Sequence, residues 1–171
     1  MKAGDIIQFD YDDFLNIGWR KWLNKLIKIF DGDVNHSALY LSSGYIIEAS
    51  DESGVRKRKI RSWEKYHVLR VKPELNFKNF RASLDDYYEN TKEMKYSSRD
   101  WINSVFNKIA YKLTGKRLEL FENDKTGFIC SEYIQDFYWR YYGIDLCQFT
   151  QTETPNDFEE SQYLYKTKQK G

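Results

Sequence analysis

The order of strand-like and helix-like segments is the strongest constraint on the fold. Short apolar runs bounded by turn-forming residues predict five strands, at 5–9, 36–42, 45–49, 55–60 and 67–71. Apolar residues at helical spacing dominate the second half and predict helices at 77–92, 98–113 and about 128–142. Strands that cluster early and helices that follow favour an α+β domain, with an antiparallel sheet packed with helices, over a wound parallel sheet.

A further amphipathic helix is predicted for residues 12–30, where one side is rich in tryptophan and leucine and the other is basic. We expect its apolar stripe to pack on the sheet; the alternative is a helix that lies on a membrane surface or lines a groove for an acyl chain. A chain of 171 residues fits one domain. We expect that domain to span residues 1–155 and the polar tail, 156–171, to fray.

The composition excludes several classes of protein. A formal net charge of +1 does not call for nucleic acid or an anionic membrane as a partner, and 18% aromatic residues argue for a folded chain. We see no apolar signal-peptide core and no run long enough to span a bilayer, so the expected location is cytoplasmic. Two cysteines and two histidines without clustered ligand spacing predict neither a disulfide scaffold nor a metal site, and no cofactor is expected.

A histidine and a glutamate stand within the apolar stretch NHSALYLSSGYIIEAS (35–50). If SSG forms a three-residue hairpin loop, Ala38 faces Glu48, and His36 lies on the same face as Glu48 as its diagonal neighbour. Such neighbours have Cβ atoms on the order of 7 Å apart, within reach of a hydrogen bond. A two- or four-residue loop would put them on opposite faces. The pattern thus permits a His–carboxylate pair, and the alternative is a structural His36 with a solvated Glu48.

Cys130 occupies the start of the predicted helix in TGFICSEYIQDFYW (126–139). The positive end of the helix dipole favours the thiolate form of a cysteine placed there. A nearby imidazole base, oriented by a carboxylate, would complete the parts of a thiol hydrolase. The alternative is that Cys130 is a small apolar residue of the core, and Cys147 fits that description better.

The segments GDIIQF, HSALYL, YIIEAS and CSEYI, in this order, resemble the permuted papain-like hydrolases of the NlpC superfamily. More narrowly, the chain is similar to the YiiX/YaeF-like group of cysteine amidases, from Gly4 to about Tyr142. This resemblance implies a circularly permuted papain-like (NlpC-type) domain. It also implies catalytic roles for three residues: Cys130 as nucleophile, His36 as general base and Glu48 as the group that orients the imidazole.

The resemblance suggests two residues of a substrate pocket. Tyr96, in MKYSSRDW, resembles the K-Y-D segment that the group has before its central helices, although Ser97 replaces the usual Asp. Ser131, next to the cysteine, is the second candidate. Tyr133 stands where many relatives have an aliphatic residue, which bears on the shape of the acceptor pocket.

Two further features have a structural interpretation. The basic stretch VRKRKIR (55–61) is interpreted as a solvated edge strand whose lysines block aggregation, with phosphate or anionic-lipid contact as the alternative. His67 has no carboxylate at close spacing in the sequence and is interpreted as structural.

These observations predict a cysteine hydrolase that cleaves a peptide or lipid-linked amide through an acyl-enzyme intermediate. The alternative is a non-catalytic peptide- or lipid-binding module with the same fold. Nucleic-acid binding through the basic strand is not expected, and peripheral membrane contact stays open. If Glu48 orients His36, Glu48→Gln should lower turnover by orders of magnitude while stability changes by only about 1 kcal/mol.

Overall fold

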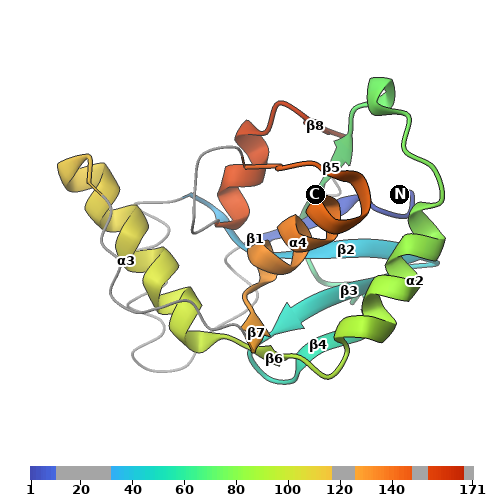
Figure 1. The fold of residues 1–171 in the computed structure, drawn as a ribbon, viewed down its shortest axis with the longest axis horizontal. Coiled ribbons are helices and arrows are strands. Elements are labelled where there is room, and N and C mark those ends of the chain that lie inside the picture. Colours follow the sequence, from blue (N-terminus) through green and yellow to red (C-terminus); the bar gives the residue numbers. More distant parts are fainter. Residues whose placement is uncertain (11–31, 117–125, 148–153, 168–171) are drawn as a thin grey trace.

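The computed structural model describes residues 1–10, 32–116, 126–147 and 154–167, so the predicted helix at 12–30 lies outside the described residues. A six-stranded antiparallel sheet forms the centre of the described part of the chain (Figure 1). In spatial order its strands are β4 (Gly54–Lys59), β3 (Tyr45–Ser50), β2 (Val34–Ser42), β1 (Ile6–Asp10), β5 (Tyr66–Val71) and β8 (Leu164–Lys166). The five predicted strands are confirmed with bounds that differ by no more than two residues.

Three α-helices follow the first five strands in the described part of the chain: α2 (Phe80–Thr91), α3 (Ser98–Thr114) and α4 (Cys130–Tyr142). In Figure 1, α4 lies in front of β1 and β2, α2 lies to its right, and α3 extends to the left. Leu39 and Ile47 from the sheet pack in one buried cluster with Tyr133 and Phe137 of α4 and Leu84 of α2. These elements make the α+β domain that the order of segments predicts.

The opposite face of the sheet carries a second buried cluster, which includes Ile7 and Phe9 of β1, Ala38 of β2 and Ile46 of β3. Because side chains alternate along a strand, His36 belongs to this same face, and its ring stacks on that of Phe9 with centroids 5.8 Å apart. Burial continues along both faces of β3, where every residue after Tyr45 is buried.

A short parallel ladder carries the chain to Cys130. Its strands are β6 (Lys95–Tyr96) and β7 (Gly127–Phe128), and it lies against β3 and β4. The two strands approach so closely that a Cβ added at Gly127 would lie 2.7 Å from the carbonyl oxygen of Lys95. Glycine at this position therefore permits the approach that brings the start of α4 to the end of β3.

The C-terminal segment differs from the predicted frayed tail. The short 3₁₀ helices of the described chain are η2 (Pro73–Leu75) and η3 (Pro155–Glu160), and β8 follows η3 and pairs with β5. Phe158 is fully buried, and the Asn156 side chain bonds both the N–H and the C=O of Val34. The sequence predicted that residues 156–171 fray, whereas in the structure buried apolar side chains hold residues 156–166 of this polar segment on the sheet.

Candidate active site

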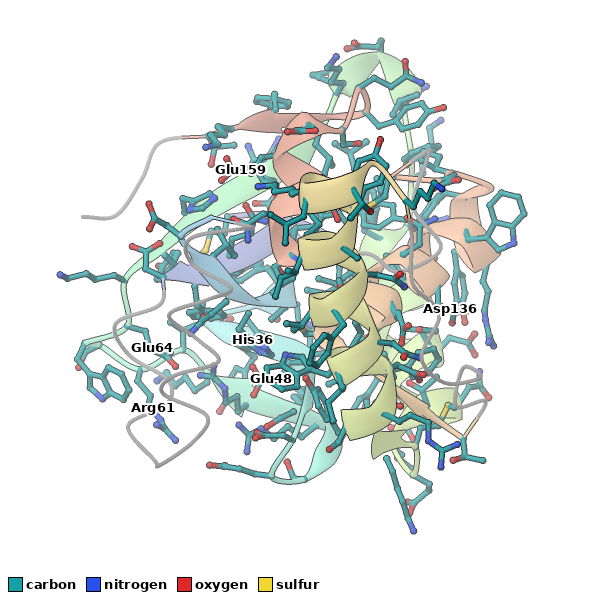
Figure 2. The ribbon with its side chains drawn as sticks, turned by 90° about the vertical axis from the view of Figure 1, so that its left-hand side faces the viewer. His36, Glu48, Arg61, Glu64, Asp136 and Glu159 are labelled. Carbon is teal, nitrogen blue, oxygen red and sulfur yellow. The ribbon has the colours of Figure 1, made fainter. Side chains whose placement is uncertain are left out.

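His36 of β2 and Glu48 of β3 lie next to each other and are joined by a hydrogen bond of 2.9 Å between His36 Nε2 and Glu48 Oε2 (Figure 2). The predicted alignment of the two strands is confirmed, since Leu39 is opposite Ile47. The loop itself differs, because Ser42 pairs with Tyr45 and the register shifts between residues 40 and 42. A two-residue turn alone would separate the pair, and the irregularity at residue 41 restores the common face.

That turn consists of Ser43 and Gly44, both in the left-handed region with φ of 49° and 79°. This is the conformation that two-residue hairpin turns prefer. The prediction of a left-handed Gly44 is thus confirmed, whereas the prediction of a three-residue loop is wrong.

Cys130 is the first residue of α4, and its thiol lies close enough to the His36 side chain to raise the pKa of the imidazole. Glu132, two residues later, accepts a 3.1 Å hydrogen bond from the backbone N–H of Ile129 and so caps the helix start. Burial by itself would lower the pKa of His36, but the hydrogen bonds and charges of Cys130 and Glu48 raise it to about 10. The arrangement therefore favours the imidazolium form of His36.

Glu48 is fully buried, and it has two partners in addition to the predicted His36. Its Oε1 accepts hydrogen bonds from Arg56 Nε at 2.8 Å and from Arg58 Nε at 2.7 Å. Burial would raise the pKa of Glu48, but the hydrogen bonds from His36 and Arg58 hold it well below its usual range. The carboxylate is therefore ionised where it meets the imidazole.

The two arginines are neighbours of the candidate site that the sequence interpretation missed. They come from the basic stretch interpreted as a solvated edge strand, and that interpretation fits Lys57, Lys59 and Arg61, which are exposed. Glu48 is directly opposite Arg56 in the β3–β4 ladder, and Arg58 lies two residues further on the same face. The same alternation argument that paired His36 with Glu48 would have found them.

The two pocket candidates have different environments. Tyr96 is half-buried on β6, opposite Phe128, and so lies beside the approach to Cys130. Ser131 is fully buried in the first turn of α4. Ser97, which replaces the usual Asp, caps α3 by accepting a hydrogen bond of 3.1 Å from the N–H of Asp100.

His67 lies away from this site in the sheet and is buried. Its Nε2 is 2.8 Å from Glu159 Oε1 and also contacts the Gln8 side-chain oxygen. Burial lowers the pKa of His67 despite this neighbouring carboxylate. The contacts agree with a structural interpretation, and the carboxylate comes from a segment far away in the sequence.

Together these observations define an α+β protein in which a cysteine at a helix start, a histidine and a buried glutamate meet. No protein-family model matches the chain, and no curated protein matches its sequence. Among solved structures, the chain is similar to the crystal structure of the metalloprotein yiiX from Escherichia coli O157:H7, with a TM-score of 0.59 and 15% sequence identity. The similarity covers 99% of this chain and 97% of that one. At this identity the likeness shows the fold alone, and the fold is YiiX-like.

The residues at the candidate site do not fit a metal centre. Within the described ranges, no group of three or more His, Cys, Asp or Glu side chains is placed to hold a metal ion. Glu48 uses one oxygen for His36 and the other for two guanidinium groups, whose charge opposes a cation.

The described helices also bear on whether a helix of this chain could span a membrane. Of the helices that the structure describes, none is both long enough and apolar enough to cross a bilayer.

Proposed function

We propose that this protein is a cysteine hydrolase in which Cys130 is the nucleophile, His36 the general base and Glu48 the residue that positions the imidazole. The observation that carries the proposal is that His36 contacts Glu48 through Nε2, while Cys130, at the start of α4, lies close enough to raise the pKa of the imidazole. A nucleophile within reach of a base that a third group orients is the arrangement of covalent acyl transfer.

The reaction begins with attack of the Cys130 thiolate on the carbonyl carbon of an amide. The carbonyl oxygen becomes an oxyanion, and the backbone N–H of Cys130, at the start of α4, is a donor for it. The tetrahedral intermediate expels the amine, which takes its proton from the His36 imidazolium, and leaves a thioester. Water, deprotonated by His36, then attacks the thioester, releases the acid and restores the thiol.

The finer assignment of the fold belongs to this proposal. A histidine strand, a glutamate strand and then a helix that begins with cysteine follow the order of the permuted papain-like, NlpC-type hydrolases. On that basis the substrate is a peptide or lipid-linked amide. A reducing compartment such as the cytoplasm would keep both thiols reduced, and Cys130 and Cys147 are free.

The test compares the two cysteines with iodoacetamide at neutral pH. Cys147 is half-buried and Cys130 is buried, so exposure alone would make Cys147 react faster. The proposal predicts the reverse, because thiolate character sets the rate of alkylation. Peptide mapping by mass spectrometry gives both rates, and His36→Ala should slow Cys130 without changing Cys147.

The same samples test turnover on a panel of peptide and N-acyl amides, with Cys147→Ala as the matched control for Cys130→Ala. We expect Cys130→Ala to abolish turnover and Cys147→Ala to keep it. Equal alkylation of both thiols, or turnover that survives Cys130→Ala, would refute the proposed chemistry. Rapid alkylation of Cys130 with no cleavage of any amide would leave a non-catalytic binding module with the same fold.

A further inference from the structure

The structure holds a second layer of charged residues behind the proposed triad. The Arg58 side chain is 12% exposed and lies between two buried acids. Its Nε donates to Glu48 Oε1 at 2.7 Å, and its Nη1 donates to Glu64 Oε2 at 3.0 Å. Glu64 is itself fixed, because its Oε2 also accepts the backbone N–H of Arg61 at 2.7 Å. Figure 2 shows Glu64 and Arg61 on the same side of the molecule as His36 and Glu48.

Arg58 also contacts the other support of the imidazole. Its guanidinium carbon lies 5.3 Å from the centre of the Phe9 ring, and that ring stacks on His36. A cation over an aromatic face at this distance is an attractive contact. Arg58 therefore contacts both groups that hold the His36 ring, the carboxylate at its edge and the aromatic ring at its face.

We propose that Arg58 is a positioning residue, anchored by Glu64, that holds the Glu48 carboxylate toward His36 and so maintains the reactive form of Cys130. The inference rests on the proposed function and names a residue that acts through Glu48 rather than on substrate. Arg56 supports it in a smaller role, because its second bond reaches Glu52, which is 75% exposed. A partner in solvent fixes a side chain less well than a buried one.

The physical argument concerns the cost of a buried carboxylate. A buried carboxylate that loses one of its cationic partners takes up a proton at a higher pH than before, and a neutral glutamic acid no longer stabilises an imidazolium. The charged or titratable groups with contacts to Glu48 include His36, Arg56 and Arg58, and those that act on His36 include Glu48 and Cys130. Loss of the Arg58 charge should therefore weaken the support that the ionised Glu48 gives to the His36 imidazolium, and the pH profile of Cys130 alkylation should move to higher pH.

The experiment measures the rate of alkylation of Cys130 by iodoacetamide from pH 4 to pH 9 in wild type and Arg58→Gln. We expect the midpoint of the rate profile to lie at higher pH in Arg58→Gln than in wild type, because the Glu48 carboxylate loses one of the two arginines that hold it ionised beside His36. Lys57→Gln and Lys59→Gln are matched controls. They remove the same charge from the same strand, but their side chains are exposed on the other face, so their midpoints should stay at the wild-type value.

A second variant allows the same measurement if Arg58→Gln does not fold. If Arg58→Gln leaves the buried Glu64 without the Arg58 charge and does not fold, the double variant Arg58→Gln/Glu64→Gln removes both charges, and the same upward shift is expected. Circular dichroism confirms folding in each case. A wild-type midpoint in either folded Arg58 variant, or an equal shift in Lys57→Gln, would overturn the positioning role.

This measurement separates the inference from the proposed function. Alkylation needs no substrate, so a shifted profile in a protein that cleaves no amide would support the role of Arg58 and refute hydrolysis. An unshifted profile in a protein that does cleave amides would support hydrolysis and refute the role of Arg58.

Discussion

Glu48 is a carboxylate with no exposed surface, and three donors from two neighbouring strands converge on it. A buried charge is costly unless it is paired and hydrogen-bonded. Here His36 takes one oxygen, and Arg56 and Arg58 share the other. The same contacts that make Glu48 tolerable in the core make it an oriented, ionised partner for the imidazole.

Replacement of Glu48 by Gln should therefore lower both reactivity and stability. The sequence led us to expect a change of only about 1 kcal/mol, but removal of one member of a buried ionic network costs roughly 3–5 kcal/mol. Urea unfolding gives the loss of stability, and alkylation of Cys130, corrected for the folded fraction, should slow at least tenfold. Glu52→Gln is the matched control, since that exposed acid bonds only Arg56 among these groups and should change neither quantity strongly.

The pH dependence of the stability loss in Glu48→Gln follows from the direction in which the pKa of Glu48 is shifted. The pKa of Glu48 in the folded protein is below its ordinary value of 4.5, so its pairing stabilises the fold above pH 4.5, and this contribution is lost as the pH falls through the folded-state pKa. The difference in unfolding free energy between wild type and Glu48→Gln should be constant above about pH 5 and shrink below it. A difference that is unchanged down to pH 2 would mean that the Glu48 charge does not stabilise the fold.

At the scale of elements, the β2–β3 pair was predictable because alternation along strands fixes which side chains share a face. The irregularity at residue 41 was not predictable, because no residue type marks it, and it compensates for a turn one residue shorter than expected. On β4 the sequence shows four basic residues in a row, and their division into two that face Glu48 and two that face solvent depends on the register with β3. Composition alone cannot show that division.

The short ladder before α4 gives a prediction at the same scale. Gly127→Ala should slow alkylation of Cys130, because a Cβ there would meet the Lys95 carbonyl at 2.7 Å and displace the chain three residues before the thiol. Gly143→Ala, at the other end of α4, is the control. Gly143 has φ of +65° with no atom within 4 Å of an added Cβ, so it should cost roughly 1–2 kcal/mol and leave the alkylation rate unchanged. Equal alkylation rates in the two variants would show that the ladder does not position Cys130.

At the scale of the whole molecule, the C-terminal segment ties together parts of the chain that are far apart in sequence. Asn156 bonds both backbone groups of Val34, which opens the strand that carries His36. Lys108 of α3 pairs with Asp157, and His67 of β5 contacts Glu159. The sequence of this segment is polar and aperiodic, so its order could not be predicted from local pattern. Its stability comes from contacts that only the assembled fold supplies.

Phe158 provides the test of that interpretation, because it is fully buried in the main core while its neighbour Glu160 is exposed. Phe158→Ala should lower the free energy of unfolding by about 3–5 kcal/mol, the usual cost of truncating a buried phenylalanine. Glu160→Ala, two residues away on the same 3₁₀ helix, should change it by less than about 0.5 kcal/mol. Chemical denaturation followed by circular dichroism measures both values. If the segment were frayed in solution, Phe158→Ala would be as neutral as Glu160→Ala, and the tie between the C-terminal segment and the strand of His36 would not exist.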